Sequence, residues 1–219
     1  TNSEEREHDF HLEVRLLAIT DDGTTFLIQS YQSERIQVRA PPAFIFKPYR
    51  ENSWPIMLDT QYRRMSKFDM TASIEEGFEF SEDDDCYVNQ RTNCFEVSTY
   101  IINNNTHDTA WICTEEGPIK KVIGIQMAFV AVEGDNHAND MVVEQDRDDN
   151  NGPAVYRPVE LDTLPPGQRT SVTVPRLHFS NATEDTKKHL HLLVRLLAVD
   201  HDGISHPIQS LVSSRFIAK

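Results

Sequence analysis

Cysteine is scarce in this sequence, with only Cys86, Cys94 and Cys113 among 219 residues. None of them belongs to a CxxC pair, and no histidine stands at the spacing of a zinc ligand. An odd number of cysteines without that spacing does not support a disulfide framework or a zinc site. We therefore expect free thiols in a reducing compartment, with no metal site and no cofactor.

Long apolar runs are also missing. No run approaches the roughly 20 residues needed to span a bilayer, and no signal peptide is present. The sequence begins at Thr1 rather than at a methionine. We therefore expect a piece of a longer intracellular protein, and no membrane contact by this segment.

Basic residues are few, because 21 Lys and Arg face 35 Asp and Glu, which gives a net charge of −14. This balance argues against a nucleic-acid ligand, since proteins that neutralise phosphates carry basic surfaces. The charge is unevenly spread, however. Acid concentrates at residues 82–85, 115–116 and 146–149, and base at residues 35–39, 47–67 and 187–188. Separate acidic and basic faces are therefore expected.

Catalytic patterns are missing as well. Asp200-His201-Asp202 and several scattered histidines fall at turns or strand edges, and no nucleophile motif accompanies them. We predict that the chain is not an enzyme.

What the sequence does contain is a long internal repeat. The stretch HLEVRLLAITDDGTTFLIQSYQSER (11–35) recurs as HLLVRLLAVDHDGISHPIQSLVSSR (191–215), offset by 180 residues without a gap. Two copies at this separation do not make a solenoid, which needs several adjacent short repeats. They indicate a duplicated supersecondary unit.

Each copy reads as a β-hairpin. Leu12, Val14 and Leu16 show the period-2 alternation of a strand, and Asp-Gly at 22–23 and 202–203 is typical of a tight turn. Similar alternation occurs at 95–99, 123–132 and 172–179, separated by Asn-, Gly- and Pro-rich loops. No long helical period is present, although residues 183–188 are compatible with a helical turn. The pattern predicts an all-β sandwich.

Three blocks resemble a known family. GFEFSEDDDCYVNQRTNCFEVS (77–98) is similar to a "G-F-x-F" opening followed by "Y/F-V-x-x-(K/R)-(K/R)-N-x-F". LPPGQRTSVTVPRLHFSNAT (164–183) resembles "L-P-P-x-Q-x-x-x-V-T-V-x-R-L-H-F-S", and SERIQVRAPPAF (33–44) resembles the closing block. These patterns belong to the PhoG-like DNA-binding family, which includes fungal meiotic and nutrient-response regulators and the animal myelin regulatory factors.

The resemblance implies a nuclear transcription factor domain that binds double-stranded DNA in a sequence-specific way. Its expected fold is an s-type immunoglobulin-like β-sandwich with short helical turns in its loops. Such a sandwich reads DNA with loops and strand ends, where the planar guanidinium of Arg matches the major-groove edge of guanine. The base-reading candidates that the resemblance implies are Arg176 and Arg147. Arg39 matches the closing "V-R-A" arginine, Arg91 matches the "(K/R)-(K/R)-N" position, and Arg35 is a further DNA-binding candidate. The candidates for phosphate contact are Arg50, Arg63, Arg64, Lys67, Lys187 and Lys188.

Several positions depart from the family pattern. Thr92 replaces the second basic residue before Asn93, the loop after Arg147 is acidic, and the linker after Phe179 lacks most of a basic run. Each lost contact weakens phosphate binding. The alternative function is a protein-interaction or oligomerisation module on the same fold, with weakened or lost DNA binding.

The order of the blocks leaves the domain organisation open. Residues 1–48 hold a duplicated hairpin, which is the tail of a preceding domain, or packs on the main sandwich, or exchanges between chains. Residues 49–219 form the predicted sandwich, which is expected to be truncated because the sequence stops at Lys219 before a second "V-R-A".

Overall fold

A computed structural model describes residues 8–10, 12–21, 23–34, 36–38, 41–90, 93–114, 117–134, 140–141, 143–146, 154–161, 164–179 and 189–219. The chain divides into two compact units, Thr1–Pro42 and Ala43–Lys219. Apart from one 3₁₀ turn, η1 (Glu51–Ser53), the regular structure of the described residues consists of β-strands. The expected all-β, immunoglobulin-like sandwich is confirmed. The residues expected to hold a helical turn, 183–188, lie outside the described part.

The first unit is an antiparallel hairpin of β2 (Glu13–Ile19) and β3 (Thr25–Gln32). Gly23 closes its turn with a φ of 83°, a left-handed conformation that favours glycine. Next to this hairpin in the chain, β1 (His8–Phe10) pairs with β4 (Ile36–Val38). The hairpin predicted from the repeat is therefore present.

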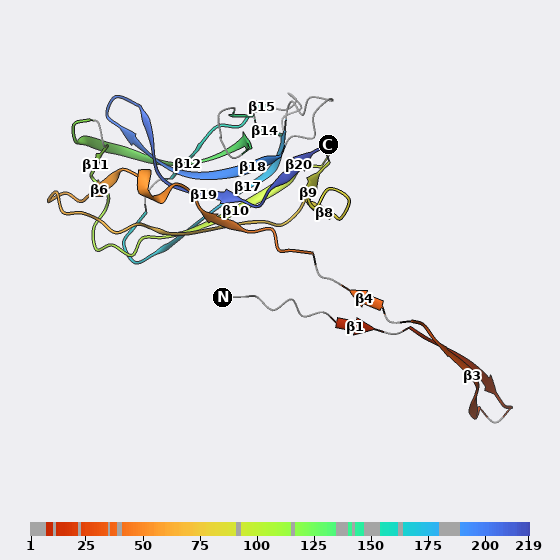
Figure 1. The fold of residues 1–219 in the computed structure, drawn as a ribbon. Coiled ribbons are helices and arrows are strands. Elements are labelled where there is room, and N and C mark those ends of the chain that lie inside the picture. The colour runs from red at the N-terminus through yellow and green to blue at the C-terminus, as the bar shows by residue number, and fades with distance from the viewer. Residues whose placement is uncertain are drawn as a thin grey trace. The chain divides into compact units, whose positions relative to one another are not determined.

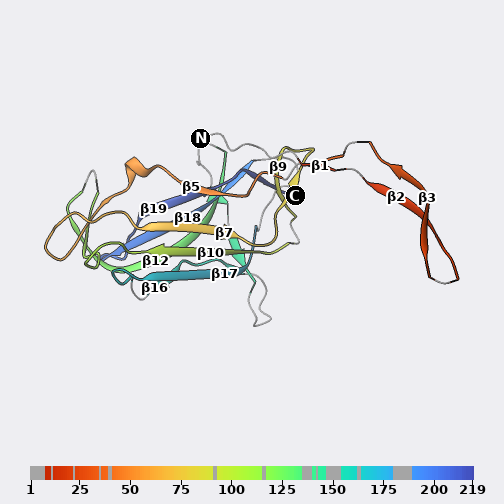
Figure 2. The ribbon, with the colours of Figure 1, turned by 90° about the horizontal axis from the view of Figure 1, so that it is seen from below.

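The second unit consists of two packed sheets, visible as layers in Figures 1 and 2. The smaller sheet has the order β15-β14-β17-β10-β7. Its strands are β7 (Asp69–Ile74), β10 (Phe95–Ile102), β14 (Val143–Gln145), β15 (Ala154–Val155) and β17 (Arg169–Phe179).

The larger sheet follows the path β6-β11-β12-β18-β20-β9-β8, with β13 and β16 also paired to β12 and with β19 between β18 and β5. Its strands are β5 (Phe46–Pro48), β6 (Ile56–Leu58), β8 (Glu79–Ser81), β9 (Cys86–Asn89), β11 (Trp111–Cys113), β12 (Lys120–Glu133), β13 (Asp140–Met141), β16 (Val159–Leu161), β18 (Leu190–Asp200), β19 (Ser205–Ser213) and β20 (Phe216–Ala218).

The hydrophobic core lies between these sheets. Val97 and Val174 of the smaller sheet and Met127, Val194 and Leu196 of the larger one are all buried members of a single cluster. At one end of the core, aromatic rings continue the contact: Phe95 stacks on Phe179 at 4.9 Å between centroids, and Phe179 on Phe216 at 5.3 Å. Burial of this apolar surface is what holds the two sheets together.

The second copy of the repeat forms the β18–β19 hairpin of the larger sheet. β18 pairs with β12 over eleven residues of its length, and β19 pairs with β5. Leu192, Val194 and Leu196 are completely buried. Pairing on both outer edges and burial on the core face therefore make this hairpin the middle of the sandwich.

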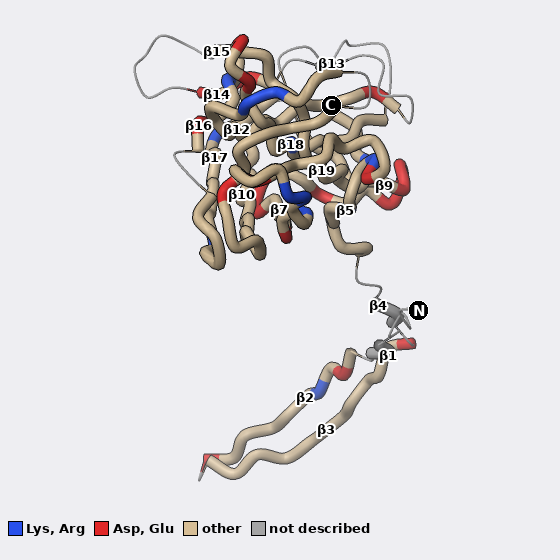
Figure 3. The backbone as a smooth tube through the Cα atoms, turned by 90° about the vertical axis from the view of Figure 1, so that its left-hand side faces the viewer, with Lys and Arg blue, Asp and Glu red and all other residues tan. Residues whose placement is uncertain are grey.

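One cluster of acidic residues lies on the second unit. Figure 3 shows them gathered at the loop before β9, where Glu82–Asp85 connects β8 to β9. Lys219 reaches this loop and pairs with Asp84. Among the described residues, the three cysteines are free, no group of acidic, histidine or cysteine side chains could hold a metal ion, and no helix is long and apolar enough to cross a membrane.

Candidate nucleic-acid interface

Arg176 is presented by a β-bulge in β17. Phe95 of β10 pairs with Leu177, but Val97 pairs with Val174, so Pro175 and Arg176 together oppose the single residue Glu96. Proline tolerates such a position because a bulge requires no ladder hydrogen bond from it. The bulge turns the Arg176 side chain to the exposed face, between buried Val174 and buried Leu177.

The backbone of Arg176 is strained. Its φ is 56°, in the left-handed region that non-glycine residues seldom occupy. Residues held in such conformations tend to occur where the side chain has a function, since the surrounding structure must impose the conformation. Gln145 Nε2 donates to the carbonyl of Pro175 at 3.1 Å, and the amide of Asp146 donates to the carbonyl of Arg176 at 3.1 Å. The end of β14 thus fixes the bulge in place.

Cys94 and Asp146 meet beside this bulge. The Cys94 thiol donates a hydrogen bond to Oδ2 of Asp146 at 3.4 Å. Burial raises the pKa of the Cys94 thiol, the Asp146 carboxylate raises it further, and the positive charge of Arg176 opposes both effects. The thiol is therefore held in its neutral form and is a poor nucleophile.

His178 of β17 lies near Asp146 and near a second carboxylate, Glu144. Its Nε2 lies 3.4 Å from Asp146 Oδ1 and 3.9 Å from Glu144 Oε2. The described surroundings of Arg176 thus include acidic as well as basic groups. Arg176 itself makes a further interaction, and the residue is exposed.

Two other predicted DNA-binding residues, Arg147 and Arg91, lie close to this site in the sequence. Asp146 directly precedes Arg147, and Cys94 follows Arg91 by three positions. Arg147 and Arg91 themselves lie outside the described residues, as do Arg35, Arg39, Lys187 and Lys188. Their roles remain predictions.

A second group of predicted residues gathers elsewhere on the same unit. Arg50, Arg64 and Lys67 line one cavity, and Arg176 is not among the residues that line it. Lys67 Nζ pairs with Glu51 Oε2 at 2.9 Å. Arg63 is paired with Asp59, whose Oδ2 accepts from Arg63 Nε at 2.7 Å. Among the described candidates, Arg50, Arg64 and Lys67 thus share a cavity that Arg176 does not line.

Sequence reasoning missed two features of these groups. Arg195, which is not among the predicted site residues, is half-buried in the wall of that cavity. The bulge at Arg176 was also unexpected, because it follows from the number of residues on the facing strand. The proline before Arg176 was the only local signal for it.

The amino-acid sequence was compared with those of known proteins, and a relative was found. No family model matches the chain. The chain is similar to Myelin regulatory factor homolog 1 from Caenorhabditis elegans, with 25% identity over 189 residues. The match covers 81% of this chain and 20% of the relative, so the chain spans about a fifth of that protein's length. The expected resemblance to myelin regulatory factors is confirmed at this level. Membership of the PhoG-like family stays a prediction.

Proposed function

We propose that this chain is a sequence-specific DNA-binding domain of a nuclear transcription factor. The observation that carries the proposal is the exposed Arg176 on a strained bulge, within the VTVPRLHF motif that suggested a base-reading arginine. Similarity to a myelin regulatory factor homolog supports the class of function. No helix in the described residues is available to enter the major groove, so loops and the bulge would make the contacts.

Arg176 acts in this proposal as a reader of guanine. Its planar guanidinium can donate two parallel hydrogen bonds to O6 and N7 of one guanine. A bulge held by β14 keeps that side chain in one place, which lowers the entropic cost of ordering it on DNA. Arg147 and Arg91 are the proposed partners of Arg176, because their sequence neighbours Asp146 and Cys94 contact each other beside the bulge.

Selection from a randomised pool of DNA duplexes tests the proposal. At low salt, the purified chain should enrich duplexes that share a GC-containing site. The net charge of −14 repels DNA, so a small number of cationic contacts must overcome that repulsion. Low salt is needed because salt weakens those contacts. If repeated rounds yield no shared site, the proposed function is wrong.

A specific observation favours a second candidate, the protein-interaction module. The β2–β3 hairpin exposes a row of large apolar side chains: Leu12, Val14, Leu16, Leu17, Ile19, Phe26, Leu27, Ile28 and Tyr31 are each between 49% and 74% exposed. Apolar patches of this kind mark interaction surfaces in soluble proteins. A second copy of the chain is the partner we propose in this case.

Sedimentation velocity over a range of concentrations separates the two candidates. An interaction module should self-associate as concentration rises, and Leu16→Glu should reverse the association because it places a charge on the apolar face. A monomeric wild-type chain that still selects DNA would rule the second candidate out.

A further inference from the structure

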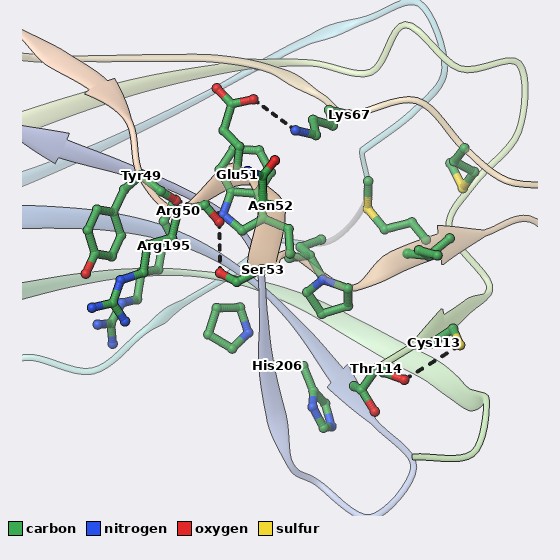
Figure 4. Close-up of a pocket in the computed structure, with 18 of the residues that line it drawn as sticks. Tyr49, Arg50, Glu51, Asn52, Ser53, Lys67, Cys113, Thr114, Arg195 and His206 are labelled. Carbon is green, nitrogen blue, oxygen red and sulfur yellow. Dashed lines mark hydrogen bonds and ion pairs between the residues drawn. The ribbon is translucent and has the colours of Figure 1, made fainter. Parts of the chain in front are cut away.

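A cavity of about 1080 Å³ opens on the second unit, apart from the Arg176 bulge. One wall is the segment Tyr49–Met57, which includes η1, and another is the stretch of β19 around Ile208 and Ser210. Arg195 of β18 and Lys67 of the segment after β6 also line it (Figure 4). Arg64 of the same segment lines it too. Sequence segments from three parts of the chain thus build one recess.

Positive charge dominates this recess. Arg50, Arg64 and Arg195 line it, and none of the three has a carboxylate partner among the described residues. The acid at the rim, Glu51, is already neutralised by Lys67 at 2.9 Å. His206 is likewise held by a carboxylate of its own, Asp200, at 2.9 Å. In a chain where acids outnumber bases 35 to 21, three unpaired guanidinium groups around one cavity indicate an external anion.

Arg50 is fixed in the recess by a strained turn. Its φ of 49° and ψ of 46° are left-handed, at the start of η1. Both the amide and the hydroxyl of Ser53 donate to its carbonyl, at 2.9 and 2.8 Å. The guanidinium lies 5.1 Å from the centre of the Tyr49 ring. Figure 4 shows the Arg50 and Arg195 side chains close together beside Tyr49.

The internal repeat explains why Arg195 is unpaired. Its counterpart in the first hairpin, Arg15, donates to Glu13 at 2.6 Å. At the position matching Glu13, the second copy has Leu193, which is completely buried. The acid that would pair with this arginine is therefore absent from the copy that faces the cavity.

An aromatic wall completes the site. Trp54 Nε1 donates to the carbonyl of Tyr49 at 2.9 Å, which fixes the indole ring. Lys67 Nζ lies 4.5 Å from the centre of that ring. A ligand in the recess would therefore meet guanidinium groups beside a rigid flat surface.

We propose that this cavity is a phosphate-binding site. Guanidinium groups match phosphate oxygens in pairs, and the resulting charge-assisted hydrogen bonds are stronger than neutral ones. The phosphate can belong to a small ligand or to a DNA backbone, and the chemistry at the cavity is the same. This proposal does not depend on base reading at Arg176.

Calorimetric titration with inorganic pyrophosphate tests the small-ligand source. Wild-type protein should bind pyrophosphate, and Arg195→Gln should weaken that binding about tenfold or more, because it removes charge-assisted hydrogen bonds. Arg50→Gln, on a different element, should have a similar effect. Arg157→Gln is the matched control, since Arg157 is exposed and does not line the cavity.

Salt titration of duplex binding tests the backbone source. If the cavity holds a backbone phosphate, Arg195→Gln should weaken binding to all duplexes equally and reduce the slope of log K against log salt by about 1. Arg157→Gln should leave the slope unchanged. A chain that binds pyrophosphate but no DNA contradicts the proposed function and supports the cavity site. Absence of pyrophosphate binding together with an unchanged duplex slope in Arg195→Gln overturns the cavity site.

Discussion

The two hairpins of the repeat have one local structure in two different environments. In both, the strand pairing is the same at an offset of 180 residues: Leu16 faces Gln29 as Leu196 faces Gln209. The same bulge follows, between 16 and 17 in one copy and between 196 and 197 in the other. A side-chain hydrogen bond is also repeated. The hydroxyl of Ser33 accepts from the Leu12 amide, and the hydroxyl of Ser213 accepts from the Leu192 amide.

The two hairpins differ in how deeply their side chains are buried. Leu196 is completely buried, whereas Leu16 is 56% exposed. The Gln209 side-chain amide bridges the backbone N–H and C=O of Phe68, at 3.1 and 2.9 Å. The Gln29 side chain instead donates to the exposed Tyr31 hydroxyl. Local sequence is therefore sufficient to specify register, bulge and turn, and the sandwich adds the burial. Matched substitutions in the two copies measure how much that burial contributes to stability.

The largest difference in the free energy of unfolding should come from the matched leucines, Leu196 and Leu16. Leu196→Ala should reduce the free energy of unfolding by about 2–5 kcal/mol, because it leaves a cavity between the sheets. Leu16→Ala should change it by less than about 0.5 kcal/mol, as expected for an exposed side chain. Denaturant unfolding followed by tryptophan fluorescence reports on the sandwich, since Trp54 and Trp111 both lie in the second unit. Equal effects would mean that Leu16 also packs in a core.

A smaller difference should come from the matched glutamines. Gln209→Ala leaves the buried backbone groups of Phe68 without partners, and we expect a cost of about 1–3 kcal/mol. Gln29→Ala removes only an exposed side-chain contact and should be close to neutral. The same denaturant experiment measures both variants. A neutral Gln209→Ala would contradict the bridging role.

The smallest difference in stability should come from Asp200, at the turn, and its counterpart Thr20. Hydrogen bonds from Lys120 and His206 to the Asp200 carboxylate hold its pKa well below the ordinary value of 3.8. A carboxyl with a lowered folded-state pKa stabilises the protein above pH 3.8, and that contribution is lost as pH falls through the folded-state pKa.

Melting curves at several pH values check this turn. Asp200→Asn should lower the Tm at pH 7, and its deficit should shrink as the pH falls below about 3.8. The effect is limited because Asp202, 3.6 Å from Lys120 Nζ, remains as a partner. Thr20→Val, which removes the hydroxyl that donates to the carbonyl of Thr24 at 3.1 Å, is the control. A deficit independent of pH would show that the carboxylate charge is not the cause.

Much of the fold follows from the sequence, since alternation and turn dipeptides are local signals. The patterns at 95–99, 123–132 and 172–179 became β10, β12 and β17. The bulge at Arg176 could not be predicted, because it depends on how many β10 residues face β17. The arginine cavity was equally hidden, because Arg50 and Arg195 meet only through tertiary packing.

The central claim is that Arg176 reads a base from its bulge. Its most direct test is the affinity of wild-type protein and Arg176→Ala for a selected duplex and for a scrambled one, at fixed salt. We expect Arg176→Ala to lose about 10- to 100-fold in affinity for the selected duplex, as for one bidentate contact, with little change for the scrambled duplex. Equal affinities of both proteins for the selected duplex would contradict the claim.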